Sequence, residues 1–263
     1  MYKDSSNVAQ LWQQELTLGG YEGRVTNWFE YLNAVRLTRT WKKIFKIVKL
    51  NLRASVFEFG CGGGKHLLPL AVRGYKCSGI DCSREVVERC KSFIDDTERY
   101  SKQSLNIKIY EGDFTNFDVS ETYDLVFNFG VIEHYLDKEE RINLLKKMFD
   151  LCKAGGYVIS VVPNGVHPLR ERMKIEKLGG YKIPEIDYSP ELMIWEMEEA
   201  GAKDIKVLPH NLFGYLLIDN KVSVLKRIFN KSFYYLAQLI PQFLISKTFK
   251  NSFSLICIGK KSI

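Results

Sequence analysis

A glycine-rich segment is the first stretch of this sequence whose residue types suggest chemistry. A short apolar run leads into the segment Glu58-Phe-Gly60-Cys61-Gly62-Gly-Gly64. Glycine accepts the tight backbone angles of a turn and allows a ligand to approach the main chain closely. A helix is expected directly after the turn, and its free N–H groups favour an anionic or nucleotide-like ligand. The segment therefore predicts a cofactor-binding turn.

The spacing of these glycines separates two kinds of nucleotide site. The dinucleotide-binding pattern Gly-x-Gly-x-x-Gly, counted from Gly60, requires a glycine at position 65, where this chain has Lys65. The last glycine comes one position earlier, at Gly64, and Glu58 precedes the first glycine by two positions. The pattern therefore disfavours a dinucleotide as the ligand.

Further side chains suited to ligand contacts follow the next predicted strands. They are Asp81 and Cys82 after the second strand, Asp113 and Phe114 after the third, and Asn128 and Phe129 at the end of the fourth. In an open α/β sheet, ligands bind outside the carboxyl ends of the strands. We therefore expect these side chains beside the glycine-rich turn.

His134 is the best candidate for a catalytic base, since it comes shortly after the fourth strand in the dipeptide Glu133-His134. The unperturbed pKa of histidine is about 6.5, which suits proton transfer near neutral pH. The alternative is a structural role, in which the dipeptide caps the loop. A metal site here would need a further acid, and Asn128 and Gly130 supply none, so the sequence predicts no bound metal.

Elements that position these residues follow from the hydrophobic pattern, which alternates between strands and helices from residue 55 onward. The expected strands are 55–59, 76–80, 106–110, 125–129, 157–162, 205–208 and 253–258. The expected helices are 27–50, a helix ending near Arg73, and three helices capped by Ser83, Asp137 and Ser189 that end near Thr97, Cys152 and Ala200. The glycines of 154–156 are expected to stop the helix before the fifth strand. Apolar strands alternating with helices indicate a parallel sheet covered on both faces.

The motifs at successive strand ends resemble, in type and in order, those of class I S-adenosylmethionine-dependent methyltransferases. The resemblance covers about residues 53–163. The resemblance implies S-adenosylmethionine as the cofactor. It implies that Asp81 accepts the ribose hydroxyls, that Asp113 accepts the adenine amino group, and that Phe114 packs on the adenine ring. The implied cofactor-binding residues are Glu58, Gly60, Cys61, Gly62, Gly64, Asp81, Cys82, Asp113, Phe114, Asn128 and Phe129.

The same resemblance implies the fold and its divisions. We expect a doubly wound, Rossmann-like α/β sheet of seven strands in the order 3-2-1-4-5-7-6, with the last strand antiparallel. The expected segments are a helical cap at 1–50, the cofactor-binding core at 51–210, an insert or lid at 211–250, and the final core strand at 251–263. A segment rich in glycine and aromatic residues, Leu11 to Trp28, is expected to be a flap over the site.

Composition places the chain among globular proteins, with 46% hydrophobic and 26% charged residues in a length of 263. The six cysteines are scattered and no pair has Cys-x-x-Cys spacing, so we expect reduced thiols and a cytoplasmic protein rather than a zinc site. The polar N-terminus lacks the apolar core of a signal peptide.

Charge is unevenly distributed along the chain. All 31 acidic residues lie at or before Asp219, and eight lysines and arginines follow it. Within this basic end, 15 uncharged residues separate Lys231 from Lys247, whereas spanning a membrane takes about 20 apolar residues. Three alternatives stay open for residues 221–250: peripheral contact with a membrane, packing onto the domain, or packing onto a dimer partner.

The methyl acceptor is expected to be a small molecule, a sugar or a lipid-like compound, with O-methylation favoured. Enzymes that methylate nucleic-acid bases often carry Asp/Asn-Pro-Pro-Tyr/Phe after the fourth strand, where this chain reads Asn128-Phe-Gly-Val131. None of the seven prolines precedes a cysteine, which disfavours RNA cytosine methylation. Two other functions stay as alternatives: a non-catalytic cofactor-binding protein on the same fold, and a nucleotide-dependent oxidoreductase.

Overall fold

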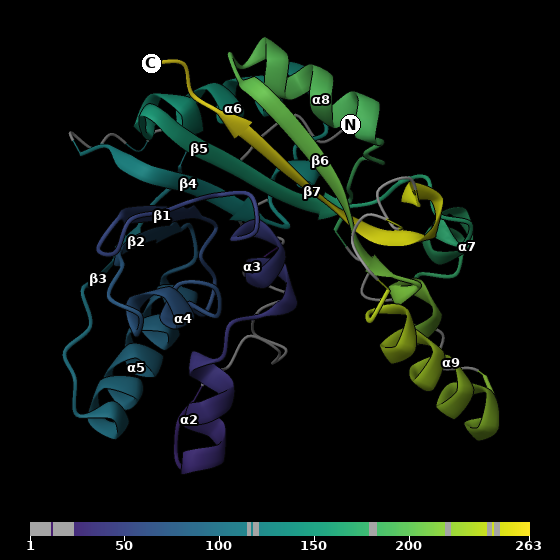
Figure 1. The fold of residues 1–263 in the computed structure, drawn as a ribbon, viewed down its shortest axis with the longest axis horizontal. Coiled ribbons are helices and arrows are strands. Elements are labelled where there is room, and N and C mark those ends of the chain that lie inside the picture. The colour runs from purple at the N-terminus through teal and green to yellow at the C-terminus, as the bar shows by residue number, and fades with distance from the viewer. Residues whose placement is uncertain are drawn as a thin grey trace.

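Seven strands form a single sheet in the described part of the chain. The computed structural model describes residues 12, 24–114, 117, 121–178, 183–218, 222–240, 244 and 248–263. The strands are β1 (Ser55–Phe59), β2 (Lys76–Asp81), β3 (Ile107–Glu111), β4 (Tyr123–Phe129), β5 (Cys152–Pro163), β6 (Lys203–Leu212) and β7 (Ser252–Lys260). Helices flank the sheet on both sides (Figure 1).

The strand order is β3-β2-β1-β4-β5-β7-β6, as predicted. The five strands β1 to β5 pair in parallel, whereas β7 runs antiparallel to both of its neighbours, β5 and β6. Four of the five residues of β1 are buried, so this central strand needs cover on both faces. The predicted doubly wound fold with an antiparallel last strand is confirmed.

Helices cover the two faces in separate groups. They are α2 (Trp28–Val35), α3 (Arg39–Ile44), α4 (Leu68–Ala71), α5 (Arg84–Ser101), α6 (Lys138–Leu151), α7 (Arg170–Ile175), α8 (Pro190–Glu199) and α9 (Val224–Ala237), with 3-10 turns η1 (Ile132–His134), η2 (Gly214–Leu217) and η3 (Phe249–Asn251). In Figure 1, α6 and α8 lie over one face of the sheet, and α3, α4 and α5 over the other. Two apolar clusters correspond to these layers: Met148 and Met193 belong to one, Trp41 and Cys90 to the other.

The single helix predicted over 27–50 is wrong, because the segment forms two helices, α2 and α3. Arg36 after α2 has an extended backbone, and the Thr38 side chain accepts the N–H of Trp41 at 3.3 Å, which starts a second helix. The apolar spacing continues across this break, so periodicity does not reveal it. Trp41 and Ile44 are fully buried, and the predicted packing of this segment onto the domain is confirmed.

Other helix boundaries also differ from the prediction. The helix after the glycine-rich turn has only four residues, and Pro69 stands in its first turn without kinking it. Ser83 precedes α5 as predicted, but its side chain makes no capping hydrogen bond, and the helix continues to Ser101. Helix α6 ends at Leu151, ahead of the glycines of 154–156, which lie inside β5.

The insert of residues 211–250 contains η2, α9 and η3 in its described part. Helix α9 points away from the body of the molecule (Figure 1), and only Asn230 and Ala237 of its residues are buried. No helix among the described residues is long and apolar enough to cross a membrane. The division into four segments stays a prediction, and the expected flap at Leu11–Trp28 falls largely outside the described residues.

Candidate functional site

The glycine-rich turn links β1 to α4 and lies across the carboxyl ends of β1 and β2. The N–H of Cys61 donates to the carbonyl of Ile80 at 3.0 Å, and the N–H of Gly62 donates to Oδ2 of Asp81 at 2.9 Å. Gly60 has φ +65°, and a Cβ added there would come within 2.6 Å of Cγ2 of Val131. Glycine is therefore required at position 60 by its backbone angle and by the close approach of the turn that follows β4.

Asp81 ties the glycine-rich turn to the end of β2. Besides the bond from Gly62, its Oδ1 accepts the N–H of Ser83 at 3.1 Å. Burial raises the pKa of Asp81, and the bonds from these backbone N–H groups oppose that change. A carboxylate has about four acceptor positions, so the bonds from the backbone of Gly62, Cys82 and Ser83 leave about one for a ligand hydroxyl.

Glu58 and Cys61 face inward rather than toward solvent. Glu58 is 1% exposed, its Oε2 has no hydrogen-bond partner among the described residues, and burial raises its pKa well above the usual value. The side chain of Cys61 belongs to the apolar cluster that also contains Cys90. A direct contact of Cys61 with the cofactor would therefore come from its main chain.

Asp113 and Phe114 lie at the end of β3, as predicted. Asp113 is exposed, while Phe114 is buried, with its ring centroid 5.8 Å from that of Phe59 and 6.1 Å from that of Tyr135. Burial, followed by the nearby charges of Asp113 and Cys82, raises the pKa of Tyr135. The structure thus adds Tyr135 to this group, a residue that no sequence pattern singled out.

Asn128 and Phe129 point to opposite faces of β4. The amide nitrogen of Asn128 donates to Oγ of Ser160 at 2.8 Å, so this side chain is part of the buried core. The ring of Phe129 packs on the other face, 4.2 Å from the ring of His66 and 5.5 Å from that of Trp41. Phe129 can form a wall of the site with its side chain, whereas Asn128 can contribute only through its main chain.

His134 lies in the turn η1, which follows the carboxyl end of β4. Its Nδ1 is 3.1 Å from the carbonyl oxygen of Pro184, which can only accept, so Nδ1 carries a proton and donates it. The neutral ring therefore has its lone pair on Nε2. Burial lowers the pKa of His134, which keeps the imidazole neutral at physiological pH.

Glu185 approaches this turn from a loop 51 residues further along the chain. Glu133, His134 and Glu185 each offer one potential ligand atom, and these three atoms lie within 4.8 Å of one another. The prediction of no metal assumed that no further acid lies near Glu133-His134, and this premise is wrong. No local pattern marks Glu185, because only the folding of its loop brings it to the end of β4.

An internal ion pair holds the turn that carries His134. The guanidinium of Arg141 donates to the carbonyl oxygens of Tyr135 and Leu136 at 2.8 and 2.9 Å. It also pairs with Glu196 of α8 at 2.8 Å, and both side chains are almost fully buried. The segment directly after η1 is thus fixed by α6 and α8.

The remaining histidines are used within the fold. Nε2 of His210 lies 3.0 Å from Oγ1 of Thr40, and the ring of His167 stacks on that of Tyr215 at 4.9 Å. His66 packs edge-on against Phe129, and burial lowers its pKa to about 3. All six cysteines are free.

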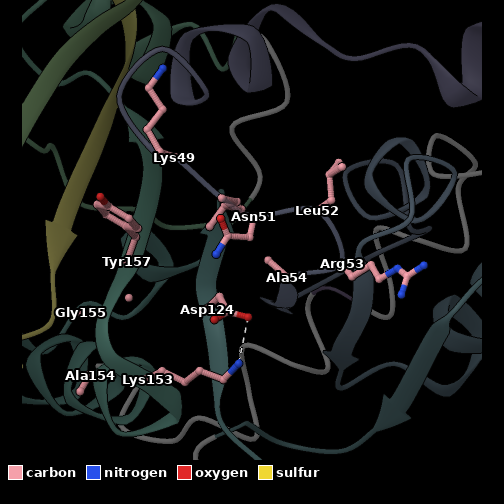
Figure 2. A pocket seen from close by; sticks show the side chains of 12 residues that line it. Lys49, Asn51, Leu52, Arg53, Ala54, Asp124, Lys153, Ala154, Gly155 and Tyr157 are labelled. Atoms are coloured by element: carbon pink, nitrogen blue, oxygen red, sulfur yellow. Dashed lines mark hydrogen bonds and ion pairs between the residues drawn. The ribbon is translucent and has the colours of Figure 1, made fainter.

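A separate cavity of about 350 Å³ lies at the opposite end of the strands from the glycine-rich turn (Figure 2). It is lined by residues 49–54, Asp124 and residues 153–157, and Nζ of Lys153 lies 2.9 Å from Oδ2 of Asp124. Asp124 is near the amino end of β4, whereas the glycine-rich turn follows the carboxyl end of β1. This cavity is therefore not the cofactor site.

Known proteins resemble the core of this chain in sequence and in fold. Residues 56–156 match a family described as a methyltransferase domain. The chain is 25% identical over 147 residues to the probable S-adenosyl-L-methionine-dependent methyltransferase TehB of Haemophilus influenzae strain 10810, covering 56% of this chain and 48% of that protein. It is 29% identical over 117 residues to the ubiquinone biosynthesis O-methyltransferase of Rickettsia akari, covering 44% of each. In both matches this chain spans less than half of the relative.

Solved structures give the same fold at lower sequence identity. A SAM-dependent methyltransferase from Archaeoglobus fulgidus aligns with a TM-score of 0.55 and 18% identity, over 89% of this chain and 99% of that chain. Residues 56–156 thus match a methyltransferase domain, and the strand order is the one that the resemblance to class I S-adenosylmethionine-dependent methyltransferases implied. S-adenosylmethionine is the cofactor of this class.

Proposed function

We propose that this protein transfers the methyl group of S-adenosylmethionine to a small-molecule, sugar or lipid-like acceptor, with O-methylation favoured. The observation that carries the proposal is the bond from the N–H of Gly62 to Asp81, which draws the glycine-rich turn against the acid that would bind the ribose. The proposed cofactor-binding residues are Glu58, Gly60, Cys61, Gly62, Gly64, Asp81, Cys82, Asp113, Phe114, Asn128 and Phe129.

The chemistry asks little of the protein. The sulfonium of the cofactor already activates its methyl group, and the sulfur leaves as a neutral thioether when the acceptor attacks. The protein has to place the two reactants in line and exclude water. Only an acceptor that must lose a proton, such as a hydroxyl, needs a base.

Calorimetric titration with S-adenosylmethionine, S-adenosylhomocysteine and NAD tests the cofactor. We expect micromolar binding of the first two and none of NAD. The Asp81→Ala variant should lose this binding, while Asp124→Ala, at the opposite end of the sheet, should keep it. Binding of NAD, or of none of the three by the folded wild-type protein, would refute the proposal.

For the catalytic base we propose His134. The proton on Nδ1 is directed to Pro184, so Nε2 is the nitrogen able to accept the proton of an acceptor hydroxyl. Base catalysis typically contributes a factor of about 10² to 10⁴ in rate. His134→Gln should lower kcat by that order and leave the affinity for S-adenosylmethionine unchanged. An unaltered kcat would assign His134 a structural role.

We also propose that the insert docks on an anionic lipid surface, which would bring a lipid-like acceptor to the site. Helix α9 exposes a set of apolar side chains, Val224, Leu225, Ile228, Phe229, Tyr235 and Leu236. The same helix carries Lys226, Arg227 and Lys231, and no acidic residue follows Asp219. Basic and apolar side chains together on one exposed helix suit the interface of an anionic bilayer.

Vesicle sedimentation tests this docking. We expect binding to vesicles containing phosphatidylglycerol and weak binding to pure phosphatidylcholine. Leu225→Gln with Phe229→Gln should abolish the binding, whereas Leu52→Gln, an equally exposed position outside the helix, should not. The lipid proposal is wrong if the helix variant binds vesicles like the wild type. It is also wrong if the wild type forms concentration-dependent dimers and these dimers do not bind vesicles.

A further inference from the structure

Two carboxylates and one imidazole meet at η1, which follows the carboxyl end of β4. Glu133 and His134 come from η1, and Glu185 comes from the loop that precedes α8. Their potential ligand atoms lie within 4.8 Å of one another, so an ion bonded to all three at about 2.0–2.2 Å would draw these atoms somewhat closer together.

The main chain fixes Glu185 against the turn. On one side of it, the carbonyl of Pro184 accepts from Nδ1 of His134 at 3.1 Å. On the other side, the N–H of Ile186 donates to the carbonyl of Glu133 at 2.8 Å. Two bonds flanking a single residue fix its main chain beside η1 before any ligand binds.

Glu133 is an unsatisfied group in this cluster. The residue is 1% exposed, and its Oε2 has no hydrogen-bond partner among the described residues. Buried polar atoms are nearly always satisfied, and an exception calls for an unseen partner or a functional reason. A cation between the three side chains would supply that partner.

Arg170 orients Glu185 and balances the charge. It lies 2.7 Å from Oε1 of Glu185 and 2.6 Å from Oδ1 of Asp187, and its side chain is 3% exposed. The ion pair with Oε1 leaves Oε2 as the oxygen available to the cluster. Asp187 also pairs with Nζ of Lys174, so Arg170 and Lys174 balance Glu185 and Asp187, and Glu133 is the further acid of the cluster.

We infer that Glu133, His134 and Glu185 form a binding site for a divalent first-row transition ion. A donor set of one imidazole and two carboxylates suits Zn²⁺ or Mn²⁺ better than Mg²⁺, which prefers oxygen ligands alone. Histidines that bind a metal commonly donate their other ring N–H to a carbonyl or carboxylate, and Nδ1 of His134 makes such a bond to Pro184.

The site changes the role of His134 in the proposed reaction. Nε2 cannot hold a proton and an ion at once, so with the ion bound His134 is a ligand rather than the base. An ion here would lower the pKa of an acceptor hydroxyl that binds to it. This role rests on the proposed methyl transfer, whereas ion binding itself does not.

Isothermal titration of the metal-free protein with Zn²⁺ and with Mn²⁺ tests the site, with no acceptor present. We expect one ion per chain, and at least tenfold weaker affinity in Glu133→Gln and in Glu185→Gln. Glu140→Gln, an exposed acid on the neighbouring helix, is the control and should bind like the wild type. Thermal melts of each variant establish that it is folded.

A Co²⁺ spectrum gives a second readout that does not depend on these carboxylate variants. The d–d bands of the wild-type complex should shift or vanish in His134→Gln, because the imidazole ligand is lost. No stoichiometric binding to the wild-type protein, or equal binding by all variants, would overturn the site. The same samples are also titrated with S-adenosylmethionine. Failure of the metal site can then be distinguished from failure of the proposed methyl transfer.

Discussion

Individual residues around the glycine-rich turn are constrained by backbone angle and by contact, and the two constraints can be separated. Gly60 has φ +65° and would bring a Cβ to 2.6 Å from Val131, whereas Gly74 has φ +88° with nothing within 4 Å of an added Cβ. A side chain at position 60 would therefore cause both backbone strain and a steric conflict at the site, whereas a side chain at position 74 would cause backbone strain alone.

Alanine substitution at these two glycines makes a matched pair. Both variants should lose about 1 kcal/mol of unfolding free energy, since a non-glycine residue is disfavoured at positive φ. Gly60→Ala should lose a further ~1–3 kcal/mol from overpacking and bind S-adenosylmethionine at least tenfold more weakly. Urea denaturation and calorimetry measure both effects. Equal cofactor affinity in the two variants would show that contact with Val131 does not shape the turn.

Single residues also differ in how well the sequence predicts their place in the site. Glu58, Asp81 and Asp113 were placed correctly near strand ends, because a motif fixes its own local geometry. The side-chain direction of Asn128 was not predictable, since it depends on Ser160 of the neighbouring strand. Glu185 was missed because its proximity to His134 arises from a loop with no distinguishing pattern.

At the scale of elements, the two helices that flank the site begin in different ways. Oδ1 of Asp137 accepts the N–H groups of Glu139 and Glu140 at 2.8 and 3.1 Å at the start of α6. Ser83 makes no such bond at the start of α5, and its buried Oγ has no partner among the described residues. Both residue types are typical N-caps, but only Asp137 acts as one through its side chain.

We predict different costs for removing the two caps. Asp137→Ala should lower the unfolding free energy by about 1 kcal/mol, the usual value of an N-cap. Ser83→Ala should change it by less than about 0.5 kcal/mol or stabilise the protein, because it removes an unsatisfied buried hydroxyl. Chemical denaturation of both variants distinguishes these outcomes, and a larger loss in Ser83→Ala would mean that its hydroxyl has an unseen partner.

For the whole molecule, His210 links stability to pH. It lies in β6 and is buried against α3, where it contacts Thr40 and lies near Arg39 and Lys43. Burial lowers its pKa from 6.5 to about 3, and the two cations add to this effect. Between these values the unfolded chain binds more protons than the native one, so the contribution of His210 to stability falls as pH decreases.

His210→Gln should flatten this dependence. Between pH 6.5 and pH 5 the wild type should lose roughly 1.5 kcal/mol more than the variant, following about 1.4 kcal/mol per unit of pKa difference. Above pH 7 the slopes of the two proteins should coincide. Urea titrations at several pH values make the comparison, and parallel curves throughout would show that His210 has nearly the same pKa in the native and unfolded chains.

The sequence by itself indicated the buried strands and the glycine-rich turn, and its resemblance to class I methyltransferases implied the strand order and the cofactor. Apolar runs specify buried strands, and a glycine-rich turn carries its chemistry in a few consecutive residues, so both are local properties. Tertiary structure alone decided the break between α2 and α3, the burial of Asn128, and the meeting of Glu185 with Glu133 and His134. These features depend on contacts between segments far apart in the chain, and no local spacing encodes such contacts.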